Sequence, residues 1–355
     1  MEKYLERIEL ETDPICEMLF CLHRVGINDK YKENLSDYGL ELDGEINDWI
    51  VKVAEEFKPA KKELLSNYVT EEGFFVLGLS FILKQFNEEV TFEEFINAVK
   101  KTPNDELIFM LLAPGCEGKL TKEKLSELKK DNKAIDIIEK YFSVASNTKW
   151  TIYKILSKPE SVREELIELI TYFYNKFYKE KEVEIQKFLS KHIKDNEEQL
   201  KFSFIKSILQ IMPENYLEKI LAEKESIDVL ISYSVEYGSY FAIGEDEFVI
   251  GYRYSELMEV LLGETNSILN QANLLRILSD KTRLKILLEM RSGSKYLTEI
   301  AEKLGISNPA VKYHFNKFLS VGLIEIEKLE NRIYYRLKKE TIVKLIEELK
   351  KSFDL

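Results

Sequence analysis

The chain has 355 residues, more than one small hydrophobic core usually organises, so two or three domains are expected. Hydrophobic residues make up 45% of it and charged residues 32%, a balance that excludes a largely disordered protein. The net charge of −12 is unevenly distributed: residues 267–355 hold 17 Lys and Arg against 11 Asp and Glu, whereas the rest holds 34 against 52. A basic segment attached to an acidic remainder predicts that only this segment approaches a polyanion.

Several features of the sequence point to a cytoplasmic protein. The first ten residues are charged, and no small-residue cleavage site follows an apolar run, so we expect no signal peptide. The longest apolar run, residues 74–83, is far shorter than the ~20 residues that cross a bilayer, so no membrane contact is expected. Three cysteines in a chain of this length do not form a disulfide framework.

Helical spacing dominates the first two thirds of the chain. Thr12-Asp13-Pro14 is typical of a helix start, and apolar residues then recur through Leu22. Glycines and polar residues in the range 26–44 predict an irregular connection. From residue 45 to residue 221 one helix follows another, with breaks expected near Asn196 and Pro213.

Residues 171–178 form the densest aromatic cluster. Aromatic side chains can line a ligand pocket. They also dominate the burial of ordinary packed helices. Both interpretations stay open, and we expect the packed core.

The spacing then changes to that of strands. Short β-rich runs at 229–234, 240–243 and 248–251 are separated by turn residues and predict a small antiparallel sheet. The first ten residues, with apolar side chains among charged ones, could join this sheet as a further strand. Residues 254–279 return to helical spacing and connect the sheet to the end of the chain.

No pattern typical of catalysis or metal binding is found. Cys16 and Cys21 are five residues apart, so on one helix they point about 140° away from each other. Neither Gly-x-Ser-x-Gly nor His-Glu-x-x-His occurs, and we expect His23 and His192 to be ordinary surface or partly buried residues. The sequence therefore predicts no enzyme activity, no cofactor and no metal site.

Residues 282–337 have the spacing of a helix-turn-helix. A first apolar stripe marks a short helix and consists of Leu297, Ile300, Ala301 and Leu304. Gly305 follows where a helix ends most easily, and Ser307 can cap a second helix that has Pro309 in its first turn. The buried stripe of this second helix is expected to be Val311, Phe315 and Phe318.

Two alternating segments, 322–327 and 332–337, follow the second helix and predict a β-hairpin, with Asn331 able to take a positive φ. A helix-turn-helix followed by a two-stranded hairpin is a winged helix. We therefore expect a mainly α protein: residues 1–254 form a large helical domain with a small sheet, and residues 255–355 form a winged helix-turn-helix.

The same residues resemble the arsenical-resistance repressor (ArsR) family. Residues 277–287, ILSDKTRLKIL, look like the opening of that family's domain. Residues 297–307, LTEIAEKLGIS, and 311–315, VKYHF, resemble its helix-turn-helix, and 322–324 and 332–335 resemble its wing. The match covers about the last quarter of the chain, and several separate segments agree in order and spacing.

This resemblance implies double-stranded DNA as the partner. By resemblance, the early residues of the second helix enter the major groove, which makes Asn308, Pro309, Ala310, Lys312 and Tyr313 candidates for base contacts, with Asn316 also exposed. His314 matches a position where the family usually has histidine, and it could donate to a phosphate. Ser307 would cap the second helix and leave the amides at its N-terminus directed at the phosphate backbone of the DNA. Near the wing tip, the candidates are Lys328, Asn331 and Arg332.

The family also implies a homodimer paired through the helices that flank the motif. The candidate dimer residues are Ile268, Leu274, Ile342, Leu345, Ile346 and Leu349. The alternative is that this apolar stripe only covers its own domain. Some relatives sense metals through cysteine in the first motif helix or through acidic and histidine residues in the last helix. Residues 296–304 and 341–355 contain no Cys and no His, so we expect no metal sensing.

The sequence thus predicts a DNA-binding transcriptional repressor whose N-terminal domain is regulatory or oligomerising and responds to an unidentified small molecule or protein. The alternative from another class is a scaffolding protein that uses its winged helix against another chain.

Overall fold

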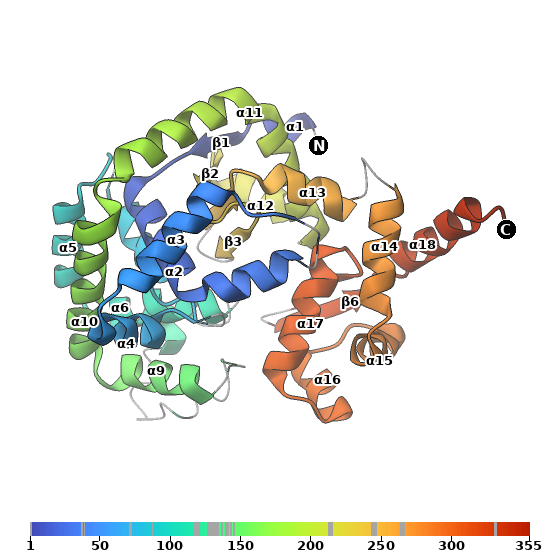
Figure 1. Ribbon diagram of the computed structural model, residues 1–355. Coiled ribbons are helices and arrows are strands. Elements are labelled where there is room, and N and C mark those ends of the chain that lie inside the picture. The colour runs from blue at the N-terminus through green and yellow to red at the C-terminus, as the bar shows by residue number, and fades with distance from the viewer. Residues whose placement is uncertain are drawn as a thin grey trace. The chain divides into compact units, whose positions relative to one another are not determined.

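The computed structural model describes residues 2–36, 38, 40–70, 73–86, 88–116, 121–125, 135, 138, 142, 144, 146–211, 216–242, 247–262, 267–329 and 332–355. The chain forms two compact units, and most of their helices and strands are labelled in Figure 1. The body comprises Glu9–Glu197 and Asp228–Tyr252. The winged-helix unit comprises Met1–Ile8, Glu198–Ile227 and Arg253–Leu355, and so draws on three stretches of the chain. In the described ranges no helix combines the length and the apolar character needed to cross a membrane.

The body is mainly helical, as predicted. Its α-helices are α2 (Pro14–Ser36), α3 (Gly44–Glu56), α4 (Pro59–Tyr68), α5 (Phe92–Lys101), α6 (Asn104–Leu112), α9 (Ser146–Ser157), α10 (Pro159–Phe173) and the first part of α11 (Glu182–Ile211). The described residues of the body also form two 3-10 helices and one π-helical turn: η1 (Leu77–Gln85), η2 (Ala113–Cys116) and η3 (Tyr174–Tyr178).

A four-stranded sheet has the order β1-β2-β4-β3, from β1 (Ile8–Glu11), β2 (Ile227–Ser232), β3 (Ser239–Ala242) and β4 (Glu247–Gly251). The predicted strand in the first ten residues is confirmed in β1, although Glu2–Leu5 is the short helix α1. The prediction of an antiparallel sheet is wrong for one pair. β3 pairs antiparallel with β4, but β2 pairs parallel with β4, with Val229 opposite Phe248. Every residue of β4 is buried, which suits a central strand covered on both faces.

Helix α2 extends much further than predicted. Residues 26–36 continue the helix instead of forming an irregular connection. Packing explains the glycine inside the helix: a Cβ added at Gly26 would lie 2.4 Å from Cγ1 of Val69, at the end of α4. Gly26 therefore permits a close approach between chain segments and does not mark a break.

A polar face of α2 holds the turn that follows β2. The Glu17 carboxylate accepts hydrogen bonds from the backbone N–H of Ser234 at 2.9 Å and of Tyr233 at 3.1 Å. The Arg24 guanidinium donates to the Ser234 carbonyl at 2.8 Å and pairs with Glu236 at 3.4 Å. Burial raises the pKa of Glu17. These buried groups join α2 to the sheet through hydrogen bonds that satisfy one another.

The aromatic cluster at 171–178 is mostly core, as expected. Phe173 and Tyr178 are fully buried, and the ring of Phe177 stacks on that of Phe57 with centroids 5.4 Å apart. Tyr172 differs, because its ring forms part of a surface groove described below.

The winged-helix unit contains α1 (Glu2–Leu5), the second part of α11, α12 (Tyr216–Glu223), α13 (Tyr254–Leu262), α14 (Ser267–Leu278), α15 (Lys281–Glu289), η4 (Met290–Ser292), α16 (Leu297–Leu304), α17 (Asn308–Ser320), β5 (Ile324–Leu329), β6 (Arg332–Leu337) and α18 (Lys339–Ser352). The first residues of the chain are held in this unit by hydrogen bonds to α12. Tyr4 donates to Glu218 of α12 at 3.2 Å, and Arg7 donates to the Leu221 carbonyl at 3.1 Å.

Helix α11 is kinked where the two units divide. The predicted break near Asn196 is confirmed, because this residue has the non-helical angles φ −131° and ψ 19°. Its side-chain amide donates to the His192 carbonyl at 3.0 Å, which compensates that carbonyl for the disturbed helical pattern. Pro213 lies outside the described residues.

Candidate nucleic-acid interface

The turn between α16 and α17 is built from the residues that the sequence indicated. Gly305 ends α16 with φ +66° and ψ 33°, the left-handed conformation that glycine adopts without strain. Ser307 then caps α17, and its side-chain oxygen accepts a hydrogen bond from the Ala310 N–H at 3.3 Å. Asp280 caps α15 in the same way, accepting from the Arg283 N–H at 2.7 Å. These residues therefore fix the start of α15, the end of α16 and the start of α17.

The inner face of α17 is fixed by three side chains. Val311, Phe315 and Phe318 are each 0% exposed, as predicted. The Phe315 ring packs against Tyr335 of the wing with centroids 4.4 Å apart. The small Ala301 on α16 is also buried, which allows the two helices to cross closely. This packing sets which residues of α17 face outward.

The outer face of α17 carries most of the predicted base-contact residues. Ser307 and Asn316 are exposed, Tyr313 is 40% exposed, and Asn308, Ala310 and Lys312 are partly exposed. Pro309 lies in the first turn of the helix, and its side chain is outside what the structure describes. Hydroxyl, amide and ammonium groups thus share one accessible helix face, the arrangement that reads base edges in a major groove.

Lys317 also belongs to this face, although the sequence reasoning did not select it. Its ammonium lies 4.7 Å from the centroid of the Tyr313 ring. The four-residue spacing from Tyr313 could have revealed it, because such residues are neighbours on a helix. The contact adds a cation to the outer face and holds the Tyr313 ring.

His314 is half buried beside the start of α15. Burial is the main cause that lowers its pKa; Asp280 opposes the shift, and Arg283 and Lys317 add to it. Its Nδ1 is buried and has no hydrogen-bond partner among the described residues. The imidazole is therefore neutral at neutral pH and can offer a phosphate an N–H group but not a positive charge.

The wing is a two-stranded antiparallel hairpin, as predicted. Leu329 pairs with Arg332 at its tip, and Lys328 pairs with Ile333 one step further in. The backbones of Lys328 and Arg332 thus lie next to the tip, their side chains are outside what the structure describes, and Asn331 is outside the described residues altogether. On the wing's surface, Arg336 binds Glu325 at 2.7 Å. Arg336, one of the cations of the wing, is therefore already neutralised within the protein.

The base of the wing is tied to the residues before α16. Lys295 forms an isolated β-bridge with Tyr335, and the Tyr296 hydroxyl donates to that of Tyr334 at 2.6 Å. Ser294 donates to the carboxylate of Glu327. Glu327, an acidic residue that would disfavour phosphate contacts, is thus held in the middle of the hairpin, two residue pairs from its tip.

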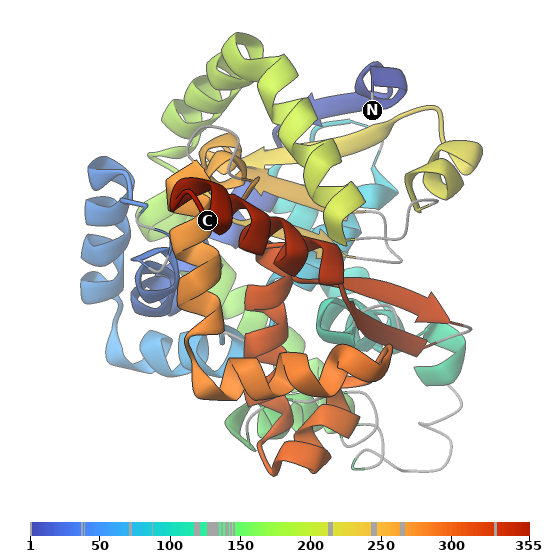
Figure 2. The same ribbon diagram turned by 90° about the vertical axis from the view of Figure 1, so that its right-hand side faces the viewer.

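The flanking helices α14 and α18 pack on each other within the unit (Figure 2). Leu274 and Leu345 are buried, at 4% and 3% exposed, and therefore cover their own domain. Ile342 and Leu349 are partly exposed, whereas Ile346 is 48% and Val343 is 51% exposed. The side chain of Ile268 is outside what the structure describes. The predicted apolar stripe is therefore split between an inner and an outer side.

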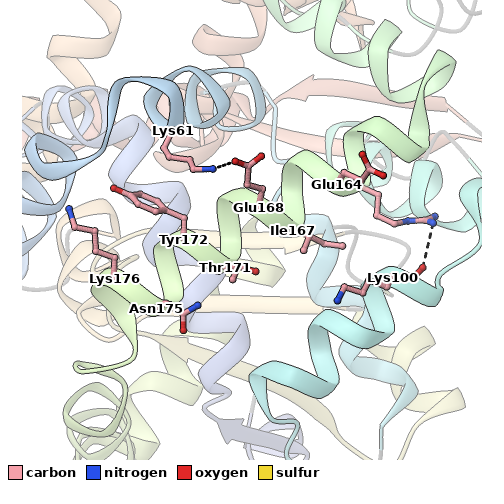
Figure 3. A pocket seen from close by; sticks show the side chains of 10 residues that line it. Lys61, Lys100, Glu164, Ile167, Glu168, Thr171, Tyr172, Asn175 and Lys176 are labelled. Carbon is pink, nitrogen blue, oxygen red and sulfur yellow. Dashed lines mark hydrogen bonds and ion pairs between the residues drawn. The ribbon is translucent and has the colours of Figure 1, made fainter.

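The body carries a surface groove of about 1000 Å³ along α10, with Lys61 of α4 and Lys100 of α5 on its sides (Figure 3). Figure 3 shows Lys61 reaching Glu168, with which it forms an ion pair. Lys176 lies 3.6 Å from Glu56 and 4.5 Å from the ring centroid of Phe177. Two of the groove's cations are thus already neutralised by the protein.

One group of three possible metal ligands comes together among the described residues. Glu9 and Glu11 of β1 and Asp228 of β2 are all exposed and lie close to one another. Burial raises the pKa of Glu11, and the neighbouring carboxylates Asp228 and Glu9 raise it further. Exposed acidic groups of this kind occur commonly without an ion.

The fold and the outer face of α17 define a winged helix-turn-helix of the DNA-binding class. Residues 280–325 match the family described as bacterial regulatory protein, arsR family, which confirms the resemblance for α15, α16, α17 and the start of β5. No curated protein and no solved structure shows a significant match to the chain.

Proposed function

We propose that this protein is a sequence-specific, DNA-binding transcriptional repressor that acts in the cytoplasm as a homodimer. The observation that carries the proposal is the accessible surface of α17, where Lys312, Tyr313 and Lys317 are exposed or partly exposed, as is Asn308 in its first turn, while Val311, Phe315 and Phe318 are buried. A helix of this kind, fixed by its core and capped at its start, can enter a major groove without rearrangement. The body is proposed to regulate this contact without a metal.

The proposed binding separates into two parts. Amide and ammonium groups of α17 select bases, whereas Ser307 at the helix start and the wing residues near Arg332 contact phosphates. Phosphate contacts release counterions, so affinity for every DNA sequence should fall steeply as salt rises. Base contacts should favour one sequence over others at any single salt concentration.

Selection of genomic fragments on the purified full-length chain tests the proposal. We expect enrichment of one sequence motif, and gel-shift titrations at increasing salt should show affinity for it falling as a power of salt concentration. In transcription reactions with purified polymerase, a template carrying the motif within its promoter should give less transcript as the protein is added.

The contrary outcome is equally defined. If no motif is enriched and affinity for DNA does not change with salt, the winged helix contacts another protein and the scaffolding function becomes the better account. Increased transcription from the same template would make the protein an activator.

A further inference from the structure

A small cavity of about 140 Å³ lies in the body, between α3, the start of α11 and the end of β2. Ordinary ligand pockets have volumes of about 300–1,000 Å³, so this cavity admits only a few heavy atoms. All of its lining residues belong to the body, so its form does not depend on the winged-helix unit.

Three aromatic side chains from different elements line this cavity: Trp49, Phe188 and Tyr233. Phe188 meets Tyr233 edge-on, with centroids 5.1 Å apart and planes at 71°. Tyr252, which is not part of the lining, packs against two of these rings: it is stacked on Tyr233 at 5.8 Å and edge-on to Phe188 at 5.0 Å. Two rings set at a steep angle, with the third aromatic side chain of Trp49 in the same lining, resemble the aromatic cages that bind alkylated ammonium groups through cation–π attraction.

The charged groups at the cavity are mostly negative. Asp43, Glu45 and Glu184 contribute three carboxylates, against the single ammonium of Lys181. Lys181 binds Glu184 at 2.9 Å and lies 3.8 Å from Glu45. One lysine cannot neutralise three carboxylates, so the lining holds an excess of negative groups.

The carboxylate of Asp43 is held in place by the fold. One of its oxygens caps α3 by accepting from the Glu45 N–H at 3.0 Å, and the other lies 3.4 Å from the Tyr252 hydroxyl. Burial raises the pKa of Tyr233, and the fields of Glu45, Asp43 and Glu184 raise it further, so its hydroxyl stays neutral. An aromatic wall and a carboxylate are therefore positioned before any ligand arrives, which lowers the entropic penalty of binding.

We propose that this cavity binds a small, free, alkylated ammonium compound, whose methyl groups contact Trp49, Phe188 and Tyr233 and whose charge is balanced by the carboxylates. The small volume favours a free molecule over the headgroup of a packed lipid. Binding here is independent of whether the winged helix binds DNA, so either proposal can fail without the other.

Isothermal titration of the full-length chain with choline, at constant ionic strength and without DNA, tests the proposal. We expect saturable binding. The uncharged analogue 3,3-dimethylbutan-1-ol has the same shape and should bind at least about tenfold more weakly, because it lacks the cation–π and carboxylate terms. Vesicles of phosphatidylcholine should not bind.

Variants locate the binding in this cavity. Phe188→Leu and Trp49→Leu keep an apolar side chain but remove a ring, so each should weaken choline binding by roughly 2- to 30-fold. Lys181→Met removes the competing cation and should strengthen binding, a result that a merely structural role for these residues does not predict. The matched control is Trp150→Leu, on α9, where the ring is 72% exposed and a loss should change nothing.

Three results would each overturn the proposal. One is the absence of saturable choline binding at millimolar concentration, and another is equal binding of choline and its uncharged analogue. The third is binding that Phe188→Leu, Trp49→Leu and Lys181→Met all leave unchanged. Binding of vesicles as tightly as choline would replace the free cation with a lipid headgroup.

Discussion

His23 shows how its surroundings set the chemistry of a single residue. Its position on α2 places it in the core at 6% exposed, where the ring stacks on Phe74 with centroids 5.6 Å apart. Its Nε2 has no hydrogen-bond partner among the described residues. Burial lowers its pKa from 6.5 to about 4. The sequence could not reveal this, because a lone histidine in a helix has no pattern that reports its burial.

The lowered pKa of His23 predicts how the stability of the protein depends on pH. In the unfolded chain His23 becomes protonated below pH 6.5, whereas in the folded chain it stays neutral until about pH 4. This difference should lower the free energy of unfolding by about 3 kcal/mol as the pH falls from 6.5 to 4. His23→Gln cannot titrate and should lack this loss. Urea unfolding of both proteins at pH 7 and pH 4 measures the difference. Asp13 and Glu17 have raised pKa values, so they increase stability as the pH falls. This effect is the same in both proteins and cancels when their pH dependences are compared. Equal pH dependence would show that His23 is not buried.

Lys312 tests the proposed DNA contact at the residue scale. If its ammonium reaches a base edge, Lys312→Ala should weaken binding to the preferred site by roughly 1–3 kcal/mol and relax the preference at one base pair. Arg332→Ala should instead weaken all sequences about equally and reduce the salt slope by about one ion. Gel-shift titrations distinguish the two. Lys344→Ala, on α18, is the matched control, and a loss as large as that of Lys312→Ala would remove Lys312 from the interface.

At the scale of elements, local patterns predicted the winged helix well. The cap at Ser307, the turn at Gly305 and the buried Val311, Phe315 and Phe318 each depend on neighbours within a few residues. The body was harder for a physical reason. The close approach of Val69 to Gly26 in α2 joins distant parts of the chain, and the parallel pairing of β2 with β4 arises because β4, and not β3, lies next to β2. Such choices arise from tertiary packing and leave little local signal. The outer face of α17 followed from the same periodicity, and the four-residue spacing from Tyr313 also indicates Lys317, whose ammonium lies over the Tyr313 ring.

The turn of the helix-turn-helix gives a test at the element scale. A Cβ at Gly305 would meet no atom within 4 Å, so Gly305→Ala tests the left-handed backbone alone and should destabilise the protein by about 1–2 kcal/mol. Gly44 provides the matched control, since it begins α3 and also has open space around its Cα. There alanine restricts the unfolded chain without strain, so Gly44→Ala should stabilise by about 0.4–1 kcal/mol. Thermal unfolding measures both changes, and equal shifts of the midpoint temperature in the two variants would argue against the left-handed turn.

At the scale of the whole molecule, the winged-helix unit is not a simple C-terminal segment. It includes Met1–Ile8 and Glu198–Ile227, and the Ser203 hydroxyl bonds to that of Ser255 at 3.1 Å. A fragment beginning at Tyr254 would lose these partners. The effect of the body on DNA binding is therefore better measured with substitutions in the full-length chain than by truncation.

The proposed dimer is tested by the outer side of α18. Leu345 is buried within its own unit, so a charge there would disturb the fold and report nothing about assembly. Val343 and Ile346 are exposed at 51% and 48%, and Val343→Glu with Ile346→Glu should abolish a dimer formed through this side while leaving the fold intact. Sedimentation velocity at micromolar concentration measures the change, with Val183→Glu on α11, 77% exposed, as the control. The preferred DNA site should then be an inverted repeat with half-sites about one helical turn, or a multiple, apart. A wild-type chain that sediments as a monomer both alone and on DNA would rule out this assembly.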